Sequence, residues 1–215
     1  MSADDEKHLV AHAGAQLVRH GMRVGLGSGS TVSCLLIELA QRSLDCIYVA
    51  ASRRTEEEAL ALGLTVAPFD SIDHLDLALD GADQVAGDGW LNKGRGAAHT
   101  REKIVASAAD TFVVLVDSSK LVDALHGPVP LELMSFGLSN TLARLSPSEV
   151  RAAPRSPDGG VIADYRGEVG DPGALAARLS STPGVVGHGL FAPSMVSQVI
   201  AAIGTSIRSI TNGGG

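Results

Sequence analysis

The sequence has few aromatic residues, few cysteines and a shortage of positive charge, and each shortage argues against a class of protein. Aromatic residues make up 3% of the chain and the net charge is −7, which disfavours a general nucleic-acid binder, since such a protein needs a basic face. Cys34 and Cys46 are too few for a disulfide framework or a zinc site, so we expect both in the core. The charged N-terminal segment 1–12 has no apolar signal region, and no apolar run reaches the ~18 residues of a membrane span. We therefore expect a cytoplasmic protein that binds neither nucleic acid nor membrane.

What the chain has instead is small aliphatic residues and glycine. Hydrophobic residues make up 45% of its 215 positions, an ordinary globular composition, and 25 positions are glycine. Glycine permits tight turns and close backbone approaches. The length suits one core domain that carries a small extra lobe.

Short apolar runs alternate with helical patterns over the first 126 residues. This alternation predicts an α/β fold with a mostly parallel, doubly wound sheet, covered by helices on both faces. The expected strands are 22–26, 46–50, 64–67, 75–79 and 112–116. The expected helices are 4–19, 32–40, 55–62 and 101–109.

After Gly127 the pattern changes to strands at 129–133, 161–165 and 185–191 with helices at 138–145 and 174–179. This order predicts a small inserted ferredoxin-like α+β lobe. We expect an α/β catalytic domain of residues 1–126 plus 198–215 and a lobe of residues 127–197.

A loop rich in glycine and serine, residues 25–31, lies between the first expected strand and the next helix. Backbone N–H groups at such a helix start can bind an anion, and Ser28, Ser30 and Thr31 add hydroxyl donors. The dinucleotide fingerprint is incomplete, because Ser30 replaces its third glycine and residues 52–54, Ser-Arg-Arg, stand where NAD folds carry an acid. An NADP site, with an arginine on the 2′-phosphate, and a simple glycine turn with a serine cap both stay open.

Three other polar segments follow expected strands or open a helix. They are Asp80-Gly81-Ala82-Asp83, the basic loop 92–96 that leads to Glu102 in a helical first turn, and the segment 117–120. Ligands of open parallel sheets bind beyond the carboxyl ends of the strands, which makes these segments candidates. Each also suits an ordinary turn, cap or exposed loop. His8 and His12 have a helical spacing that zinc sites use, but no Glu or Cys accompanies them in a known motif, so we predict no metal.

Taken together, these segments resemble ribose-5-phosphate isomerase of the A type. The similarity runs in order through almost the whole chain, which makes it far more specific than any single motif. The matching segments are 24–31, 51–55, 80–83, 93–94, 100–105, 117–120, 128–132, 184–186 and 189–191.

The resemblance implies an activity, a set of site residues and an assembly. The activity is the interconversion of D-ribose 5-phosphate and D-ribulose 5-phosphate in the pentose phosphate pathway, with Glu102 as the proton acceptor and with no cofactor or metal. The family also implies that the small-molecule partner is a phosphosugar and that the protein is a homo-oligomer, a dimer or tetramer. The residues implied to contact substrate are Ser28, Gly29, Ser30, Thr31, Asp80, Gly81, Ala82, Asp83, Lys93, Gly94, Arg95, Gly96 and Lys120.

These residue types suit an isomerisation through an enediolate. We expect Glu102 to move a proton from C2 to C1 and Lys93 to stabilise the enediolate oxygen. Triosephosphate isomerase, which has another fold, pairs a glutamate base with an electrophile in an analogous reaction. Asp80, in preference to Asp83, is expected to assist ring opening. Residues 28–31, with Lys120 and Lys7, are candidates to hold the phosphate.

The chain departs from the family pattern at a few positions. Gln84 replaces a glutamate and so removes a charge beside the site, Arg95 replaces a glycine, and His99 replaces a small apolar residue. The turn 156–160 is only loosely kept. These departures leave two alternatives: an isomerase of a different phosphosugar, and a non-catalytic sugar-phosphate sensor. Against the sensor, Glu102 is present and no helix-turn-helix segment is visible.

Overall fold

The computed structural model describes residues 2–211, which form two compact units. The first, here called the sheet unit, comprises Met1–Ala82, Arg101–Leu121 and Pro193–Gly215; the second, the lobe unit, comprises Asp83–Thr100 and Val122–Ala192. The grouping differs from the expected domains at residues 83–100, 122–126 and 193–197. The reason is strand pairing, because β4 (Gln84–Ala86) and β5 (Leu91–Asn92) join a small sheet of their own rather than the central sheet. Met1 and residues 212–215 of the expected first domain lie outside the described residues.

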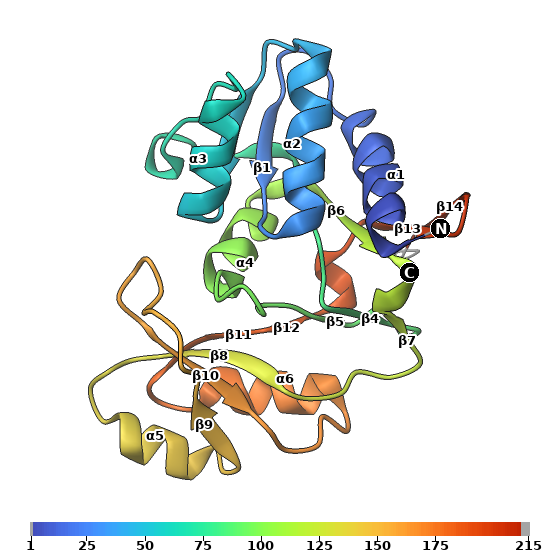
Figure 1. Cartoon of the computed structure of the whole chain (residues 1–215). Coiled ribbons are helices and arrows are strands. Elements are labelled where there is room, and N and C mark those ends of the chain that lie inside the picture. Colours follow the sequence, from blue (N-terminus) through green and yellow to red (C-terminus); the bar gives the residue numbers. More distant parts are fainter. Residues whose placement is uncertain (1, 212–215) are drawn as a thin grey trace. The chain divides into compact units, whose positions relative to one another are not determined.

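The sheet unit is built on a six-stranded sheet in the order β14-β13-β6-β3-β1-β2. All neighbouring pairs are parallel except β13 and β14, which are antiparallel. Figure 1 labels β1, β6, β13 and β14 of this sheet. The bounds of its strands are β1 (Arg23–Leu26), β2 (Ile47–Ala50), β3 (Leu75–Asp80), β6 (Ala109–Asp117), β13 (Gln198–Ile203) and β14 (Ser206–Thr211). The expected strand at 64–67 is only a single bridge between Tyr48 and Val66.

Helices cover both faces of this sheet, as the doubly wound pattern predicts. On one face, Val10 and Leu35, from two helices, pack with Leu26 and Leu115 of the sheet in one buried cluster. On the other face, a side chain at Gly25 would overlap Val105, so a third helix packs directly on β1. The helices are α1 (Ala3–Ala15), α2 (Ser30–Arg42), α3 (Arg53–Ala61) and α4 (His99–Ser107), with short 3₁₀ turns η1 (Phe69–Ser71), η2 (Ser118–Lys120) and η3 (Pro193–Met195).

The lobe unit contains the predicted ferredoxin-like arrangement. Its main sheet has the order β11-β8-β10-β9, with every neighbouring pair antiparallel. The elements follow as β8 (Val129–Leu133), α5 (Leu138–Arg144), β9 (Ser148–Val150), β10 (Val161–Tyr165), α6 (Pro172–Ser181) and β11 (Val185–His188). The sequence does not predict the short strand β9, because its three residues are partly or fully exposed and show no apolar run.

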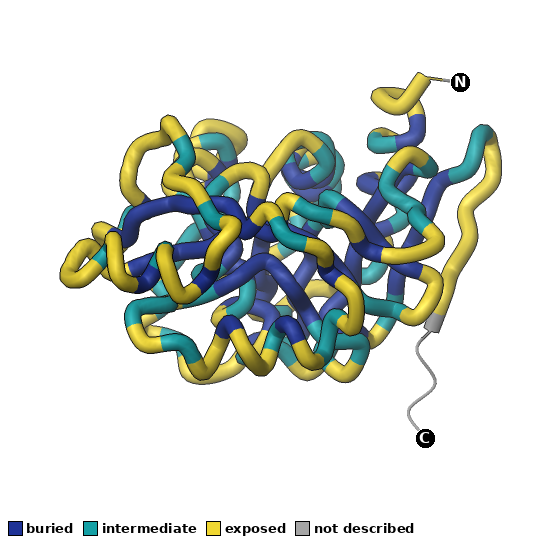
Figure 2. Tube along the Cα trace, turned by 90° about the horizontal axis from the view of Figure 1, so that it is seen from below, coloured by how far each residue is buried: buried dark blue, intermediate teal, exposed yellow. Residues whose placement is uncertain are grey.

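One face of the lobe sheet packs on its helices. Leu131, Leu133, Tyr165 and Leu179 belong to this second buried cluster. The small sheet of the unit has the order β12-β5-β4-β7, with β12 (Leu190–Phe191) and β7 (Leu121–Val122) at its edges. In Figure 2 the strands appear as the long buried runs of the trace, whereas the turns and β14 are mostly exposed. Among residues 2–211, the helices are too short or too polar for any of them to cross a membrane.

Candidate functional site

The carboxyl ends of three parallel strands bring polar residues to one edge of the central sheet. β1 runs into the loop that contains Ser28, β3 ends at Asp80, and β6 ends at Asp117. Since β1 pairs with β3, and β3 with β6, these ends are neighbours. This is the edge at which open parallel sheets bind their ligands.

Asp80 fixes the backbone of the serine-rich loop. Its Oδ1 accepts hydrogen bonds from the N–H of Ser28 at 3.1 Å and of Gly81 at 2.7 Å, and the residue is only 3% exposed. A Cβ at Gly27 would overlap the carboxyl group of Asp80. Glycine at this position is therefore what lets the loop backbone lie against the carboxylate.

Glu102 reaches the same serine from α4. The Oγ of Ser28 donates a hydrogen bond of 2.6 Å to Oε1 of Glu102, which is 5% exposed. Ser28 thus contacts Asp80 through its backbone and Glu102 through its side chain. Two buried carboxylates of the sheet unit, both predicted from the sequence, converge on one residue.

The start of α2 is the segment for which the sequence predicts an anion site. Its first turn contains no acidic residue, and its N-cap, Gly29, has a φ of 95° that favours glycine. Thr31 lies close to the turn 80–83, since a Cβ at Gly81 would be 3.8 Å from Thr31 Cβ. The loop is held from behind by Thr55, whose Oγ1 donates to the carbonyl of Gly27 at 2.8 Å. An N-terminus of this kind favours a bound phosphate.

The turn that carries Lys120 is fixed by a residue that the sequence does not single out. Glu6 of α1 accepts hydrogen bonds from the N–H and Oγ of Ser118, at 2.8 and 2.7 Å, and from the N–H of Gly204 at 2.7 Å. The Ser118 hydroxyl, then the two N–H groups, lower the pKa of Glu6. Because its partners lie 112 and 198 residues away in the chain, no local pattern could have revealed this role.

Lys7, a candidate for phosphate binding, pairs with Asp4. The Nζ of Lys7 lies 2.8 Å from Asp4 Oδ1. This hydrogen bond raises the pKa of Lys7, and the charge of Asp117 contributes in the same direction. The ammonium group therefore stays charged.

The basic loop of the lobe unit is fixed in a different way. Lys93 is 3% exposed, its N–H donates to the carbonyl of Gly189 at 2.8 Å, and its Nζ lies 5.4 Å from the centre of the Phe191 ring. Gly94 has a φ of 107°, and a Cβ there would be 2.6 Å from His99 Nδ1. The departure at His99 is therefore a buried residue that packs against the loop glycine.

Asp83 and Arg95 contact each other across this loop. The N–H of Arg95 donates to Asp83 Oδ2 at 2.8 Å, and Arg95 Nε lies 3.7 Å from Asp83 Oδ1. Arg151, not predicted from the sequence, donates from Nη1 to the carbonyls of Gly94 and Arg95 at 3.2 and 2.9 Å. Asp83, Lys93, Gly94, Arg95 and Gly96 thus belong to the lobe unit, whereas the other predicted site residues belong to the sheet unit.

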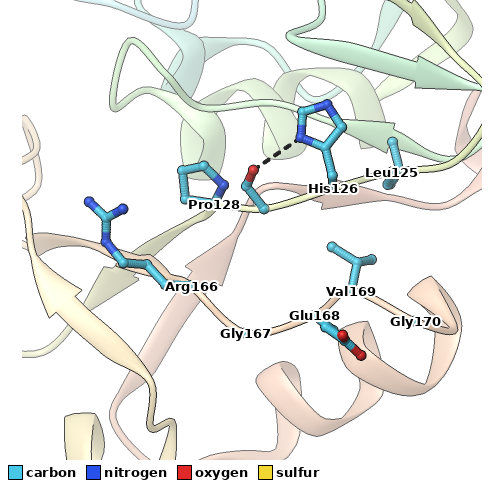
Figure 3. Close-up of a pocket in the computed structure, with 9 residues that line it drawn as sticks. Leu125, His126, Pro128, Arg166, Gly167, Glu168, Val169 and Gly170 are labelled. Atoms are coloured by element: carbon cyan, nitrogen blue, oxygen red, sulfur yellow. Dashed lines mark hydrogen bonds between the residues drawn. The ribbon is translucent and has the colours of Figure 1, made fainter.

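Gln84 forms hydrogen bonds with His126, a residue that lines a cavity of the lobe unit. It brackets the backbone of His126, accepting from its N–H at 2.9 Å and donating to its carbonyl at 3.0 Å. His126 lines a cavity of about 530 Å³ between the segments 125–128 and 166–170, shown in Figure 3 with the 3.1 Å contact from His126 Nδ1 to the Gly127 carbonyl. None of the predicted site residues lines this cavity.

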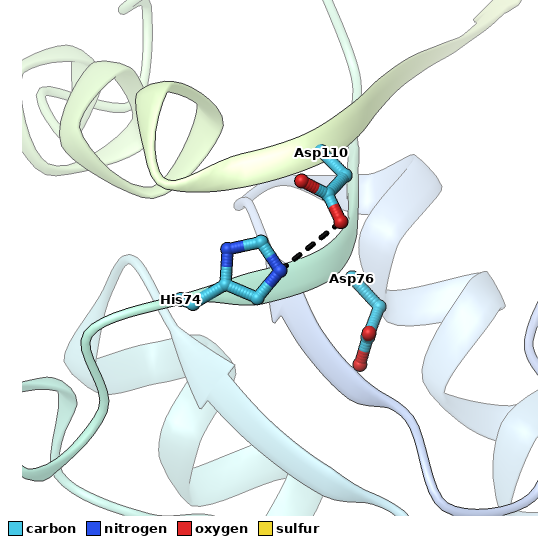
Figure 4. A group of neighbouring side chains, drawn as sticks. All are labelled: His74, Asp76 and Asp110. Carbon is cyan, nitrogen blue, oxygen red and sulfur yellow. Dashed lines mark hydrogen bonds and ion pairs between the residues drawn. The ribbon is translucent and has the colours of Figure 1, made fainter.

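One group of potential metal ligands occurs among residues 2–211, and it lies away from the predicted site. His74, Asp76 and Asp110 stand where β3 and β6 begin, the opposite ends from Asp80 and Asp117, with ligand atoms within 4.8 Å of one another. The His74 ring points toward Asp110 in Figure 4, and its Nε2 lies 3.0 Å from Asp110 Oδ2. Asp76 accepts a hydrogen bond from the N–H of Arg23 at 2.7 Å. These contacts account for the group without an ion.

Comparison with known proteins gives one consistent family. The sequence model described as "Ribose 5-phosphate isomerase A (phosphoriboisomerase A)" matches residues 47–205. The protein named ribose-5-phosphate isomerase A of Caulobacter sp. (strain K31) is 42% identical over 206 residues, which cover 89% of this chain and 91% of the relative. The protein of the same name from Synechococcus sp. (strain JA-3-3Ab) is 40% identical over 217 residues, covering 93% and 94%.

Solved structures agree over nearly the whole chain. The ribose 5-phosphate isomerase A of Methanocaldococcus jannaschii superposes with a TM-score of 0.92 at 31% identity, covering 98% of this chain and all of that one. A D-ribose-5-phosphate isomerase in complex with phospho-erythronic acid superposes with a TM-score of 0.93 at 30% identity, covering 99% and 100%.

Proposed function

Since the chain belongs to the ribose 5-phosphate isomerase A family, we propose how its own residues interconvert D-ribose 5-phosphate and D-ribulose 5-phosphate. The observation that carries the proposal is the convergence of Glu102 and Asp80 on Ser28 at the ligand-binding edge of the sheet. Aldose–ketose isomerisation needs a proton to leave C2 and a proton to arrive at C1. A single positioned carboxylate can perform both transfers.

Glu102 is the proton carrier in this proposal. It is buried, it lies in the first turn of α4, and its Oε1 already accepts a hydrogen bond from a hydroxyl. In the reaction, Glu102 takes the C2 proton and an enediolate forms. The hydroxyl proton on the C2 oxygen passes to the C1 oxygen, and Glu102 returns its proton to C1, which leaves the carbonyl at C2. The Ser28 hydroxyl holds the carboxylate in place between the two transfers.

Asp80 is the better candidate for ring opening. It contacts the residue that also holds Glu102, whereas both oxygens of Asp83 face the loop residue Arg95. Asp80 would accept a proton from the C1 hydroxyl of the closed sugar and help return one to the ring oxygen. Asp83 instead positions the loop that follows Lys93.

The phosphate is assigned to the start of α2. Backbone N–H groups and the hydroxyls of Ser30 and Thr31 offer donors, and no acid in the first turn opposes the charge. Lys120, on a turn fixed by Glu6, and Lys7 supply positive charge. Lys93 is assigned to the enediolate oxygen on the family resemblance, with its burial in support, since a buried cation interacts strongly with a developing charge.

The proposal is tested by a coupled assay of ribose 5-phosphate consumption with Glu102→Gln beside the wild type. We expect kcat to fall by roughly 10²–10⁴-fold, the usual contribution of a general base. The variant should still bind phospho-erythronic acid, because the amide keeps the shape of the side chain. Near-normal turnover would refute the role of Glu102.

The same assay separates the alternatives. Turnover of a hexose phosphate above that of ribose 5-phosphate would indicate a different sugar preference, and binding without any turnover would indicate a sensor. A fluorescence titration with NADPH tests the remaining cofactor hypothesis, and we expect no binding. We further propose a cytoplasmic homo-oligomer, a dimer or tetramer, whose size light scattering would measure.

A further inference from the structure

The lobe unit contains a second cavity, of about 270 Å³, whose lining is rich in arginine. One wall is formed by residues 95–97 of the basic loop, and the other by residues from Arg151 to Pro157. Three of the nine lining residues are arginines, and none is acidic. The lining residues are Arg95, Gly96, Ala97, Arg151, Ala153, Pro154, Arg155, Ser156 and Pro157.

Two buried carboxylates contact residues of the lining. Asp164 forms a two-point ion pair with Arg151, at 3.1 Å to Nε and 2.5 Å to Nη2. Glu132 accepts the hydroxyl hydrogen bond of Ser156. The three arginines therefore supply all the charge in a lining that otherwise consists of small residues and prolines.

The arginines differ in how firmly they are held. The Arg151 side chain is 19% exposed, and three of its nitrogens donate hydrogen bonds, so its position is fixed. Arg155 is exposed and donates from Nη1 to the carbonyl of Gly159 at 3.0 Å, without an ion pair among the contacts described. Arg95 is 80% exposed and only 3.7 Å from Asp83 through Nε. Arg95 and Arg155 thus retain donors that can turn toward a ligand.

We propose that this cavity binds a small phosphate-bearing anion through Arg95 and Arg155, beside the fixed guanidinium group of Arg151. Guanidinium groups match phosphate oxygens with paired hydrogen bonds, which are the strong charge-assisted kind. The volume lies just below the ~300–1,000 Å³ typical of drug-sized ligands, so the occupant is small. Pro154 and Pro157 limit the movement of one wall, which reduces the entropy lost on binding.

The cavity is coupled to the loop that the family resemblance assigns to substrate. Arg95 contributes its side chain to the cavity, while its N–H holds Asp83. Arg151, which also lines the cavity, donates hydrogen bonds to the carbonyls of Gly94 and Arg95. An anion that draws Arg95 away from Asp83 changes the loop, so occupancy should alter KM for the phosphosugar. This consequence rests on the proposed function; the binding itself does not.

The test is a calorimetric titration of the whole protein with inorganic pyrophosphate, in the presence of saturating phospho-erythronic acid to occupy the substrate site. We expect one pyrophosphate per chain, with an affinity that falls as salt is added. Arg155→Gln and Arg95→Gly should each weaken binding by roughly 10-fold, the low end for losing a charge-assisted contact at an exposed site. Arg144→Gln, an exposed arginine on α5 outside the cavity, should leave the affinity unchanged.

Two results would overturn the proposal. One is the absence of pyrophosphate binding while the substrate site is filled; the other is equal affinity in wild type, Arg155→Gln and Arg95→Gly. Arg155→Gln should keep the wild-type kcat and KM without pyrophosphate, which shows that it folds. If phospho-erythronic acid fails to bind, the proposed function is at fault, and pyrophosphate binding is then judged from Arg155→Gln against Arg144→Gln.

Discussion

Two glycine-bearing loops carry most of the predicted site residues, and they differ in the contacts that hold them in place. The loop 25–31 is fixed from within the fold, by the buried carboxylate of Asp80 and the hydroxyl of Thr55. The loop 93–97 is fixed by charged side chains at its surface, Asp83 and Arg151. The first loop leaves no room for an added side chain at Gly27. The second leaves none at Gly94, where a Cβ would be 2.6 Å from His99 Nδ1, yet it accommodates an arginine at position 95. Tolerance to change should therefore differ sharply between positions 27 and 95.

The largest effect in the second loop is expected at its buried lysine. Lys93→Met keeps an unbranched side chain but removes the cation, which lies 5.4 Å from the centre of the Phe191 ring and is proposed to stabilise the enediolate. We expect kcat to fall by roughly 10²–10³-fold, the range for loss of one electrostatic contact to the transition state, with little change in phospho-erythronic acid binding. A kcat within about threefold of wild type would remove Lys93 from the mechanism.

Gly27→Ala should break the first loop. The new methyl group would overlap the Asp80 carboxyl, so either Asp80 or the Ser28 backbone must shift. Displacement of reacting groups by about 1 Å can cost on the order of 10²-fold in rate, and we expect kcat/KM to fall that far. Gly87→Ala is the control, since Gly87 has no positive φ and a Cβ there would meet only the carbonyl oxygen of Asp123, at 3.7 Å. Equal activity of the two variants would contradict the close-packing account.

Glu6→Gln tests the support behind the phosphate end of the first site. The amide loses one acceptor of the Ser118 and Gly204 hydrogen bonds, so the turn with Lys120 loosens. We expect KM for ribose 5-phosphate to rise by roughly 10-fold, the loss of about one hydrogen bond, with kcat nearly unchanged. An unchanged KM would show that the turn holds its position without Glu6.

The same variant has a pH signature. Because the hydrogen bonds lower the pKa of Glu6 below its ordinary value of 4.5, its contribution to stability is present above that value and is lost as the pH falls through the lowered pKa. The melting temperatures of wild type and Glu6→Gln should therefore differ at pH 7 and converge under acid conditions. A constant difference across this range would contradict the assignment.

Arg95→Gly should have the smallest effect on catalysis. The backbone N–H that holds Asp83 remains, and only an exposed ion pair of 3.7 Å is lost. Exposed pairs contribute about 0–1 kcal/mol, so we expect KM to change by no more than about fivefold. Steady-state kinetics that show a loss as large as that of Gly27→Ala would mean that both loops are equally constrained.

The regular elements could be predicted from the sequence because their signals are local. Apolar runs indicate β1, β2, β3 and β6 of the central sheet, whereas the exposed strand β14 has no such run and is not predicted. The order of motifs indicates the family and, through it, Glu102, Asp80 and the serine-rich loop. Short, exposed β9 has no such signal. The run at 64–67 has the composition of a strand, but it forms only one bridge, between Val66 and Tyr48.

The supporting residues could not be found in this way. Glu6 and Arg151 act on partners more than 50 positions away, and nothing in their own neighbourhoods marks them. Gln84 shows the limit of interpreting a single position: its substitution for glutamate suggests only a lost charge, yet its amide brackets the backbone of His126. Long-range hydrogen bonds depend on the assembled fold rather than on the local pattern.

The absence of a side chain at Gly25 sets the position of Glu102, the proposed proton carrier. With no Cβ there, Val105 rests on β1 itself, and Glu102 projects from the preceding turn of the same helix. A bulkier residue at position 25 would push the helix away from β1 and move the Glu102 carboxylate away from the edge of the sheet where we propose that the sugar binds. Substitutions meant to change the sugar preference should therefore keep the contact between Gly25 and Val105. The loop 93–97 is the better place for them, because position 95 accommodates a long, exposed side chain.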